Sequence, residues 1–233
     1  MNEKIAIALD VSSRQDALRL VKELQGLAGM FKVGSQLYMA AGPSVVGEII
    51  EAGGKVFLDL KFHDIPNTVT RAAVAAAQLG VSMMTIHASG GRTMMESAAR
   101  EVREKLGEKR PIIVAVTVLT SFDRRALMEI GVDETLDDHA QRLAMLAENA
   151  GIDGVVCSPH EIQLIRAAVK PAFKIVVPGI RMPDQSRNDQ QRAATPREAI
   201  SAGADYIVVG RAVTDERNPR AALERIAASI TGA

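Results

Sequence analysis

Short apolar runs alternate with helical patterns along the chain, and this alternation limits the possible folds more than any other feature. Continuous apolar runs of this length are typical of strands buried on both faces of a parallel sheet. The expected strands are Ile5–Leu9, Met30–Val33, Val56–Leu60, Ser82–Ile86, Ile112–Val118, Gly154–Cys157, Phe173–Val177 and Tyr206–Val209. Between them, apolar residues at helical spacing or alanine-rich stretches predict helices at Asp16–Leu27, Val69–Leu79, Asp138–Ala150 and Pro219–Ile230.

Eight strands separated by helices, in a chain of 233 residues, match a (β/α)8 TIM barrel in both count and length. We therefore expect residues 1–233 to form a single α/β domain of this kind. A doubly wound open sheet is the alternative, but no Gly-x-Gly-x-x-Gly motif follows the first strand. Glycines that precede new strands are expected to end helices: Gly29, Gly53, Gly54, Gly80, Gly151 and Gly203.

The charge balance and the cysteine count exclude several classes of protein. Lys+Arg and Asp+Glu are both 28, so nothing favours general binding to nucleic acid or to a membrane surface. No segment approaches the ~20 apolar residues of a membrane span, and the first apolar run is too short for a signal peptide. A single cysteine, Cys157, excludes a disulfide within the chain and is expected in the core. We expect a cytoplasmic protein.

The run Asp59-Leu60-Lys61-Phe62-His63-Asp64 places charges where the third expected strand ends. Because side chains on a strand alternate between faces, Asp59 and Lys61 share one face. Charges in a folded core are costly unless they are paired, and such pairs gather at functional sites. A structural ion pair is the simpler interpretation of an isolated Asp-x-Lys, so the rest of the chain must decide between the two.

Polar residues follow nearly every expected strand, which is the place where barrel enzymes carry their active sites. In chain order they are Asp10, Lys32, Asp59, Lys61, Asp64, His87, Thr117, Thr120, Ser158, Arg181 and Arg211. A barrel without a function would have little reason for this distribution. The sequence therefore predicts an active site at the carboxyl ends of the strands.

The last two strand ends predict a phosphate site, because such sites in barrels are often built by the loops after strands seven and eight. Gly210 lets the backbone approach an anion closely, and Arg181 supplies a planar cation suited to phosphate. The polar segment 182–192 is long for a loop between a strand and a helix, as active-site lids often are. We expect Gln190 to reach the phosphate from this lid.

The histidines give weaker signals. His139 and His160 are expected on exposed helical surfaces, and His87 is expected to pack locally at a strand end. His63 with Asp64 provides too few ligands at a suitable spacing for a metal site. We therefore predict no metal site.

The sequence resembles the orotidine 5'-monophosphate decarboxylase family, in its short bacterial-type form, along the whole chain. The markers are Ala8-Leu9-Asp10, Lys32-Val33-Gly34, Asp59-Leu60-Lys61-Phe62-His63-Asp64-Ile65-Pro66-Asn67-Thr68, Val118-Leu119-Thr120-Ser121, Pro178-Gly179-Ile180-Arg181 and Val209-Gly210-Arg211. The resemblance implies a carboxy-lyase of UMP biosynthesis that converts orotidine 5'-monophosphate to UMP and CO₂. It also implies a homodimer with shared active sites and no metal or organic cofactor.

The resemblance further implies a role for each residue that matches a marker. Lys61 would protonate the carbanion at pyrimidine C6, Asp59 would face the substrate carboxylate, and Lys32 would hold the charge array. The remaining roles are Asp64 and Thr68 in the partner subunit's site, Asp10 at the ribose, Thr120 at the pyrimidine, Pro178 in the substrate pocket, and Arg181, Gln190, Gly210 and Arg211 at the phosphate.

Two alternatives stay open at this point. Sugar-phosphate decarboxylases and aldolases built on the same barrel also carry an Asp-x-Lys-x-x-Asp run, but they use Mg²⁺ and an enediolate. The Thr120-Ser121 strand end and the segment from Arg181 to Gln190 favour the nucleotide over a sugar phosphate. A non-catalytic barrel that only binds nucleotides is the second alternative, and it would be expected to lack one of the charged residues.

Overall fold

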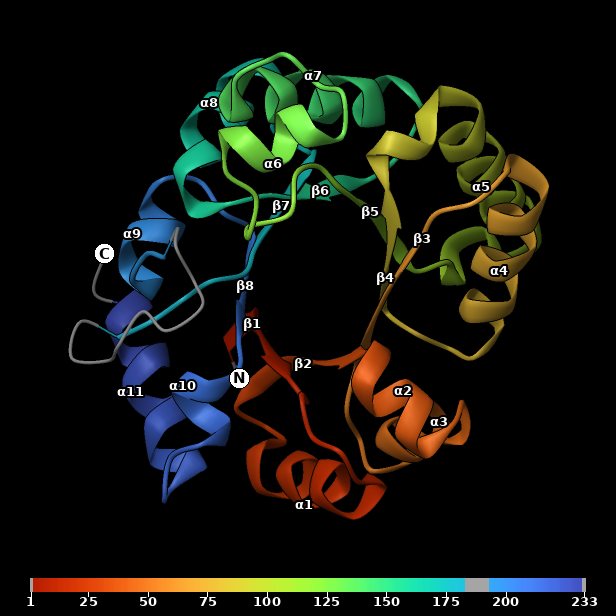
Figure 1. Cartoon of the computed structure of the whole chain (residues 1–233). Coiled ribbons are helices and arrows are strands. Elements are labelled where there is room, and N and C mark those ends of the chain that lie inside the picture. The colour runs from red at the N-terminus through yellow and green to blue at the C-terminus, as the bar shows by residue number, and fades with distance from the viewer. Residues whose placement is uncertain (1, 183–192, 232–233) are drawn as a thin grey trace.

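A computed structural model of the chain describes residues 2–182 and 193–231, and its eight parallel strands form a closed barrel in chain order (Figure 1). The strands are β1 (Asn2–Ala8), β2 (Ala28–Gly34), β3 (Val56–Phe62), β4 (Met83–His87), β5 (Ile112–Val116), β6 (Gly154–Val156), β7 (Lys174–Val177) and β8 (Tyr206–Val209). Pairing of β8 with β1, at Ile5 and Ile207 among others, closes the ring. The expectation of a (β/α)8 barrel is confirmed, and the open sheet is excluded.

Helices surround the ring of strands (Figure 1). They are α1 (Arg14–Leu24), α2 (Ser35–Ala41), α3 (Ser44–Glu51), α4 (Pro66–Gln78), α5 (Gly91–Leu106), α6 (Arg124–Glu129), α7 (Leu136–Asn149), α8 (Ile162–Ala168), α9 (Pro196–Ser201), α10 (Arg211–Thr214) and α11 (Pro219–Thr231). Short 3₁₀ turns lie at η1 (Ala88–Gly90), η2 (Gly107–Lys109) and η3 (Pro159–Glu161). The four helices expected from the sequence correspond to α1, α4, α7 and α11, with shifted ends. No helix among the described residues is long and apolar enough to cross a membrane.

The first helix shows why its ends differ from the prediction. It begins at Arg14, two residues earlier than expected, because the Ser13 side chain accepts a hydrogen bond from the Asp16 backbone N–H. It ends at Leu24, three residues before the expected Leu27, and Gly26 follows with a φ of 82°. Local capping chemistry, which the spacing of apolar residues does not report, therefore sets both ends.

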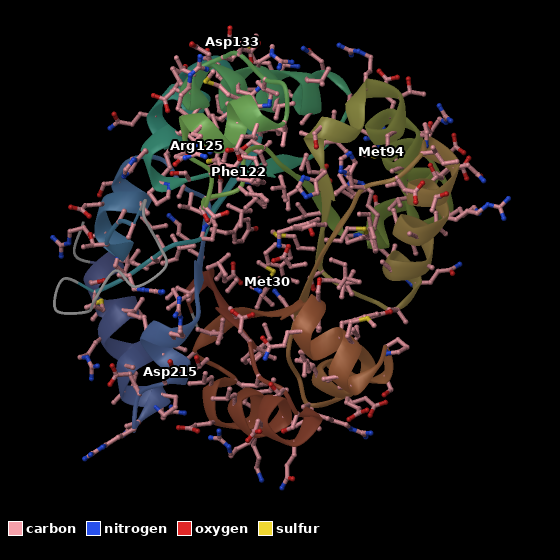
Figure 2. All side chains as sticks on the ribbon, in the orientation of Figure 1. Met30, Met94, Phe122, Arg125, Asp133 and Asp215 are labelled. Carbon is pink, nitrogen blue, oxygen red and sulfur yellow. The ribbon has the colours of Figure 1, made fainter. Side chains whose placement is uncertain are left out.

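Apolar side chains form two separate cores, one on each side of the strands. The larger lies between the barrel and its helices, where Met94 of α5 packs. The smaller fills the barrel interior, and Figure 2 shows Met30 near the middle of the ring. The interior core consists of Ala6, Ala8, Met30, Phe57, Met83, Val114, Val176 and Val208.

The interior core also determines which residues face the carboxyl end of the barrel. Because side chains alternate along a strand, a residue two positions beyond an interior residue points into the same space. These positions are Asp10 after Ala8, Lys32 after Met30, Asp59 after Phe57, Thr85 after Met83, Val116 after Val114, Pro178 after Val176 and Gly210 after Val208. The barrel therefore gathers a ring of mostly polar residues directly above an apolar floor.

One of the glycine predictions is wrong. Gly53, Gly80, Gly151 and Gly203 follow helices with positive φ, as expected, but Gly29 lies inside β2. A Cβ atom on Gly29 would come within 2.5 Å of the backbone oxygen of Glu3 in β1. Gly29 is thus required for the close approach of two strands, and it does not end a helix.

His139 also differs from the prediction of an exposed helical residue. It is only 8% exposed, and its Nδ1 atom lies 2.9 Å from a carboxylate oxygen of Glu134 and 2.9 Å from a guanidinium nitrogen of Arg142. His160 is exposed, as expected. The apolar pattern of α7 did not predict the burial of His139, because polar contacts rather than apolar packing cover this side chain.

The amino end of the barrel carries ion pairs of a structural kind. The Asp153 carboxylate accepts hydrogen bonds from the Arg110 guanidinium at 2.6 and 2.7 Å and from the Ile113 backbone N–H of β5 at 2.9 Å. The Asp205 carboxylate repeats this arrangement with Arg166 and with the Ile175 backbone N–H of β7. Each carboxylate thus joins an arginine to the start of a neighbouring strand.

The close contact between β6 and β7 allows a test of strand packing. A Cβ atom on Gly154 would lie 2.3 Å from the backbone oxygen of Lys174, so we expect Gly154→Ala to force the two strands apart. Overpacking of this kind costs about 1–3 kcal/mol, and thermal unfolding followed by circular dichroism should show a lower Tm. Gly47→Ala is the matched control, since Gly47 lies in α3 with no atom near its Cβ position. It should leave the Tm unchanged or raise it, and equal Tm values for both variants would contradict the packing argument.

Candidate active site

A cavity of about 240 Å³ opens at the carboxyl end of the barrel. Its floor is apolar and includes Ala8, Phe57 and Val208 of the interior core. Its wall contains most of the site residues that the sequence predicts, namely Asp10, Lys32, Asp59, Lys61, Thr120, Pro178, Arg181, Gly210 and Arg211. The structure therefore brings together residues that are up to 201 positions apart in the sequence, from Asp10 to Arg211.

A chain of alternating charges crosses one side of this cavity. The Lys61 ammonium donates to both oxygens of the Asp59 carboxylate at 2.9 Å. The Lys32 ammonium lies 3.6 Å from Asp59 Oδ2 and 3.2 Å from Asp10 Oδ1. Each ammonium thus lies against at least one carboxylate.

Asp59 is the most deeply buried of these groups, with an exposure of 9%. Burial alone would raise its pKa. The charges of Lys32 and Lys61, together with hydrogen bonds from Lys61 and Thr85, outweigh burial and lower the pKa below its usual value. Asp59 therefore remains a carboxylate at neutral pH, and its negative charge stays next to the cavity.

Lys61 has an unusual backbone conformation. Its φ of 52° makes it the one non-glycine residue with positive φ in ranges 2–182 and 193–231. The pairing of β3 with β4 shifts register between Leu58 and Phe62, and the Lys61 N–H donates instead to the Thr85 hydroxyl at 2.8 Å. A left-handed conformation costs a non-glycine residue about 1–3 kcal/mol, and such strain is often found at functional sites.

The other side of the cavity carries the predicted phosphate residues. Arg181 follows β7, which lies four strands from β3 in either direction around the ring. Gly210 and Arg211 follow β8, and all three residues line the cavity. Because Gly210 has no side chain, its backbone is open to a bound group. An anion held here would face Lys61 across the cavity.

Some predicted residues lie elsewhere. Asp64 is exposed, does not line the cavity, and accepts a hydrogen bond from the Ile65 backbone N–H at 2.6 Å. Thr68 is exposed in the first turn of α4 and also lies outside the cavity wall. Gln190 lies outside the described residues, as do all residues of the expected lid 182–192 except Met182. Within one chain, therefore, neither Asp64 nor Thr68 completes the charge array.

Two polar strand-end residues have structural roles. The Thr117 hydroxyl donates to the Val156 backbone oxygen at 3.0 Å, and Ser158 caps the 3₁₀ turn η3.

The His63 and His87 rings lie 5.2 Å apart between their centroids. Burial, followed by the neighbouring charges of His63 and Lys61, lowers the pKa of His87. The described residues contain no group of three or more His, Cys, Asp or Glu side chains that could hold a metal.

The sequence did not indicate every residue of the site. Val118 and Leu119 line the cavity, although only Thr120 of their marker was given a role, and Cys157 lines it although it was expected only as a core residue. Thr85 lies behind Asp59 and donates to its Oδ1 atom at 3.0 Å. The alternation of side chains along β4 could have indicated Thr85, because it is two positions beyond Met83.

This arrangement suits a small molecule that carries negative charge. Two arginines and an open backbone at one side can hold an anionic group. On the other side, a fixed ammonium can stabilise negative charge that develops during a reaction and can then donate a proton. The neighbouring carboxylate makes this side unfavourable for a second anion at rest.

Comparisons with known proteins agree with this description. Residues 3–226 match the family described as "Orotidine 5'-phosphate decarboxylase / HUMPS family". An orotidine 5'-phosphate decarboxylase of Moorella thermoacetica is 50% identical over 232 residues, covering 98% of this chain and 92% of the relative. The enzyme of the same name from Syntrophotalea carbinolica is 49% identical, covering 99% of this chain and 96% of the relative.

A solved structure gives the same result at the level of the fold. The crystal structure of orotidine 5'-phosphate decarboxylase from Lactobacillus acidophilus superposes with a TM-score of 0.86 and 36% identity, covering 97% of this chain and 98% of that one. The resemblance in the strand-end motifs thus extends over the full chain, in sequence and in structure. The chain belongs to the orotidine 5'-phosphate decarboxylase / HUMPS family, and the expectation of a carboxy-lyase of that family is confirmed.

Proposed function

We propose that this protein converts orotidine 5'-monophosphate to UMP and CO₂ in pyrimidine biosynthesis. The proposal rests on the position of the Lys61 ammonium at the cavity wall, where it donates to both carboxylate oxygens of the buried Asp59. Arg181 and Arg211 line the opposite side of the same cavity. A nucleoside monophosphate has its phosphate at one end and its base at the other, so it matches this separation of charge. The names of the full-length relatives support the same substrate.

In the proposed reaction, the bond between pyrimidine C6 and the carboxylate breaks, and CO₂ leaves without the bonding electron pair. The pair remains in an orbital at C6 that the ring delocalises poorly. The positive charge of Lys61 stabilises this pair, and Lys61 then donates a proton to C6 to give UMP. The lysine amine regains its proton from water before the next turnover.

Asp59 and Lys32 prepare the site for this step. Asp59 faces the substrate carboxylate and favours its departure as neutral CO₂, and it also holds the Lys61 ammonium at 2.9 Å. Lys32 lies between Asp59 and Asp10 and keeps the two carboxylates from repelling one another. Each lysine thus has a carboxylate beside its ammonium group.

The remaining contacts hold the substrate in place. Arg181, Gly210 and Arg211 bind the phosphate, and Gln190 contributes from the lid. Asp10 contacts the ribose, Thr120 contacts the pyrimidine, and Pro178 lines the substrate pocket. Binding energy from the phosphate, which is remote from C6, orders the site and so raises kcat as well as affinity.

We propose in addition that the active protein is a homodimer in which Asp64 and Thr68 enter the partner's site. Asp64 lies in the loop after β3 and Thr68 in the first turn of α4, and both are exposed in the single chain. A carboxylate from the partner would then extend the alternation of Lys32, Asp59 and Lys61 by one more charge.

The Mg²⁺-dependent sugar-phosphate alternative fits the geometry less well. In such an enzyme, carboxylates of the Asp-x-Lys-x-x-Asp run would have to coordinate a metal ion. Here both oxygens of Asp59 accept from Lys61, and Oδ1 also accepts from Thr85. A divalent cation at Asp59 would compete with the Lys61 ammonium for the same carboxylate oxygens.

Substitution of Lys61 tests the proposed proton donor. We expect Lys61→Ala to lower kcat/KM by at least about 1000-fold, which corresponds to roughly 4 kcal/mol of transition-state stabilisation. Lys55→Ala is a matched control, because Lys55 is an exposed lysine at the amino end of the same strand. Steady-state decarboxylation assays compare the two. A Lys61→Ala enzyme within tenfold of the wild type would exclude Lys61 as the donor.

Binding measurements test the phosphate site separately from the chemistry. Loss of a charge-assisted hydrogen bond costs about 1.5–3 kcal/mol, so Arg181→Ala should weaken UMP binding roughly 10- to 100-fold. Uridine, which lacks the phosphate, should bind the variant and the wild type equally well in calorimetry. Arg225→Ala, at an exposed position of α11, serves as the control. Equal losses for UMP and uridine would remove Arg181 from the phosphate site.

Mixing two inactive variants tests the shared site. In a dimer of Lys61→Ala with Asp64→Ala, one site carries both changes and the other carries neither. After subunit exchange the mixture should recover about a quarter of the wild-type rate, because about half of the dimers are mixed. Lys61→Ala mixed with Asp59→Ala should stay inactive, since both changes affect a subunit's own site. No recovery in the first mixture would contradict a role for Asp64 in the partner's site.

A further inference from the structure

Thr85 is a fully buried residue of β4 that contacts both central members of the charge array. Its exposure is 0%, and it does not line the cavity. Its hydroxyl accepts a hydrogen bond from the Lys61 backbone N–H at 2.8 Å and donates one to Asp59 Oδ1 at 3.0 Å. A single side chain thus joins the backbone of Lys61 to the carboxylate of Asp59.

The chemistry of a hydroxyl group gives these two bonds a fixed direction. A threonine hydroxyl has one proton to donate, and the carboxylate of Asp59 takes it. The oxygen lone pairs remain free to accept from the Lys61 N–H. Because Asp59 uses the only proton, Thr85 has none to give to a substrate and acts only through its two neighbours.

The local backbone explains why such a bridge is needed. The φ of 52° at Lys61 and the register shift between β3 and β4 take the Lys61 N–H away from ordinary strand pairing. A buried N–H without an acceptor costs about 1–3 kcal/mol. The Thr85 hydroxyl replaces the missing backbone acceptor and so allows the strained conformation to persist.

We propose that Thr85 is a positioning residue for the decarboxylation, which fixes the Asp59 carboxylate and the Lys61 backbone so that the Lys61 ammonium is held in place for its reaction. The inference rests on the proposed function. Thr85 touches Asp59 and the backbone of Lys61 and acts through them. Displacing a catalytic group by 1 Å can cost about 100-fold in rate, so loss of this bridge should affect kcat more than binding.

The test compares Thr85→Val, which keeps the shape and removes the hydroxyl, with Thr85→Ser, which keeps the hydroxyl. We expect Thr85→Val to lower kcat by at least about 30-fold while KM changes less than about threefold, and Thr85→Ser to stay within about threefold of the wild-type kcat. Thr117→Val is the matched control, because Thr117 is a buried threonine at the end of β5 whose hydroxyl bonds only to the Val156 backbone oxygen among the described contacts. Its kcat should remain at the wild-type value.

The pH dependence of kcat/KM provides a readout that a purely structural role would not change. The charged groups facing Asp59 are Lys32 on β2 and Lys61 on β3, and the titratable His87 on β4 also interacts with it. The Thr85 hydrogen bond lowers the pKa of Asp59, so its removal should raise that pKa. The acidic limb of the profile should therefore move to higher pH in Thr85→Val and stay in place in Thr85→Ser.

If Thr85→Val does not fold, Thr85→Ala and Thr85→Ser replace it, since both lack the methyl group and differ in the hydroxyl alone. A kcat that is equal in the Ala and Ser variants, or wild-type kcat in a folded Val variant, would overturn the positioning role. These outcomes are distinct from failure of the proposed function, in which the wild type would not convert orotidine 5'-monophosphate at all.

Discussion

The contact between Lys61 and Asp59 is the interaction on which the rest of the site depends. It places an ammonium and a buried carboxylate at the edge of an apolar barrel interior, an arrangement that is costly unless every charge has a partner. Lys32 supplies a second positive charge for Asp59, and Thr85 supplies a hydrogen bond. The strained backbone of Lys61 adds a further cost, which the surrounding cores must offset. The fold thus holds Lys61 against Asp59 in a backbone conformation that an isolated strand would not adopt.

The two ends of the barrel use carboxylates in opposite ways. At the amino end, Asp153 and Asp205 are fully engaged by arginines and by backbone N–H groups of neighbouring strands, so their charges stabilise the barrel. At the carboxyl end, the partners of Asp59 are lysines that line a cavity. The same residue type therefore joins neighbouring strands at one end and places a negative charge at the cavity wall at the other.

The sequence predicted the barrel, the end that carries the site, and most of the cavity wall, because buried parallel strands leave a clear apolar pattern. It failed where structure depends on contacts between distant segments. The sequence predicts that Gly29 ends a helix, but the structure shows that a glycine is needed there because the backbone of β1 lies so close. The sequence around Thr85 indicates only a strand residue, because its hydrogen bond to Asp59 joins two residues that are far apart along the chain. Asp59 and Lys61 do share a face, although the backbone at Lys61 departs from the strand conformation on which that prediction was based. The role of Asp64 requires a second chain and stays a prediction.

The most direct test of the account follows the ultraviolet absorbance of orotidine 5'-monophosphate as it becomes UMP, with the purified protein and excess EDTA present. We expect conversion at the same rate with and without EDTA, because in the proposed mechanism the charges of Lys61, Asp59 and Lys32 perform the chemistry. Failure to form UMP under either condition would contradict the proposed activity. Conversion that stops with EDTA and returns with Mg²⁺ would contradict the proposed mechanism and favour the metal-dependent alternative.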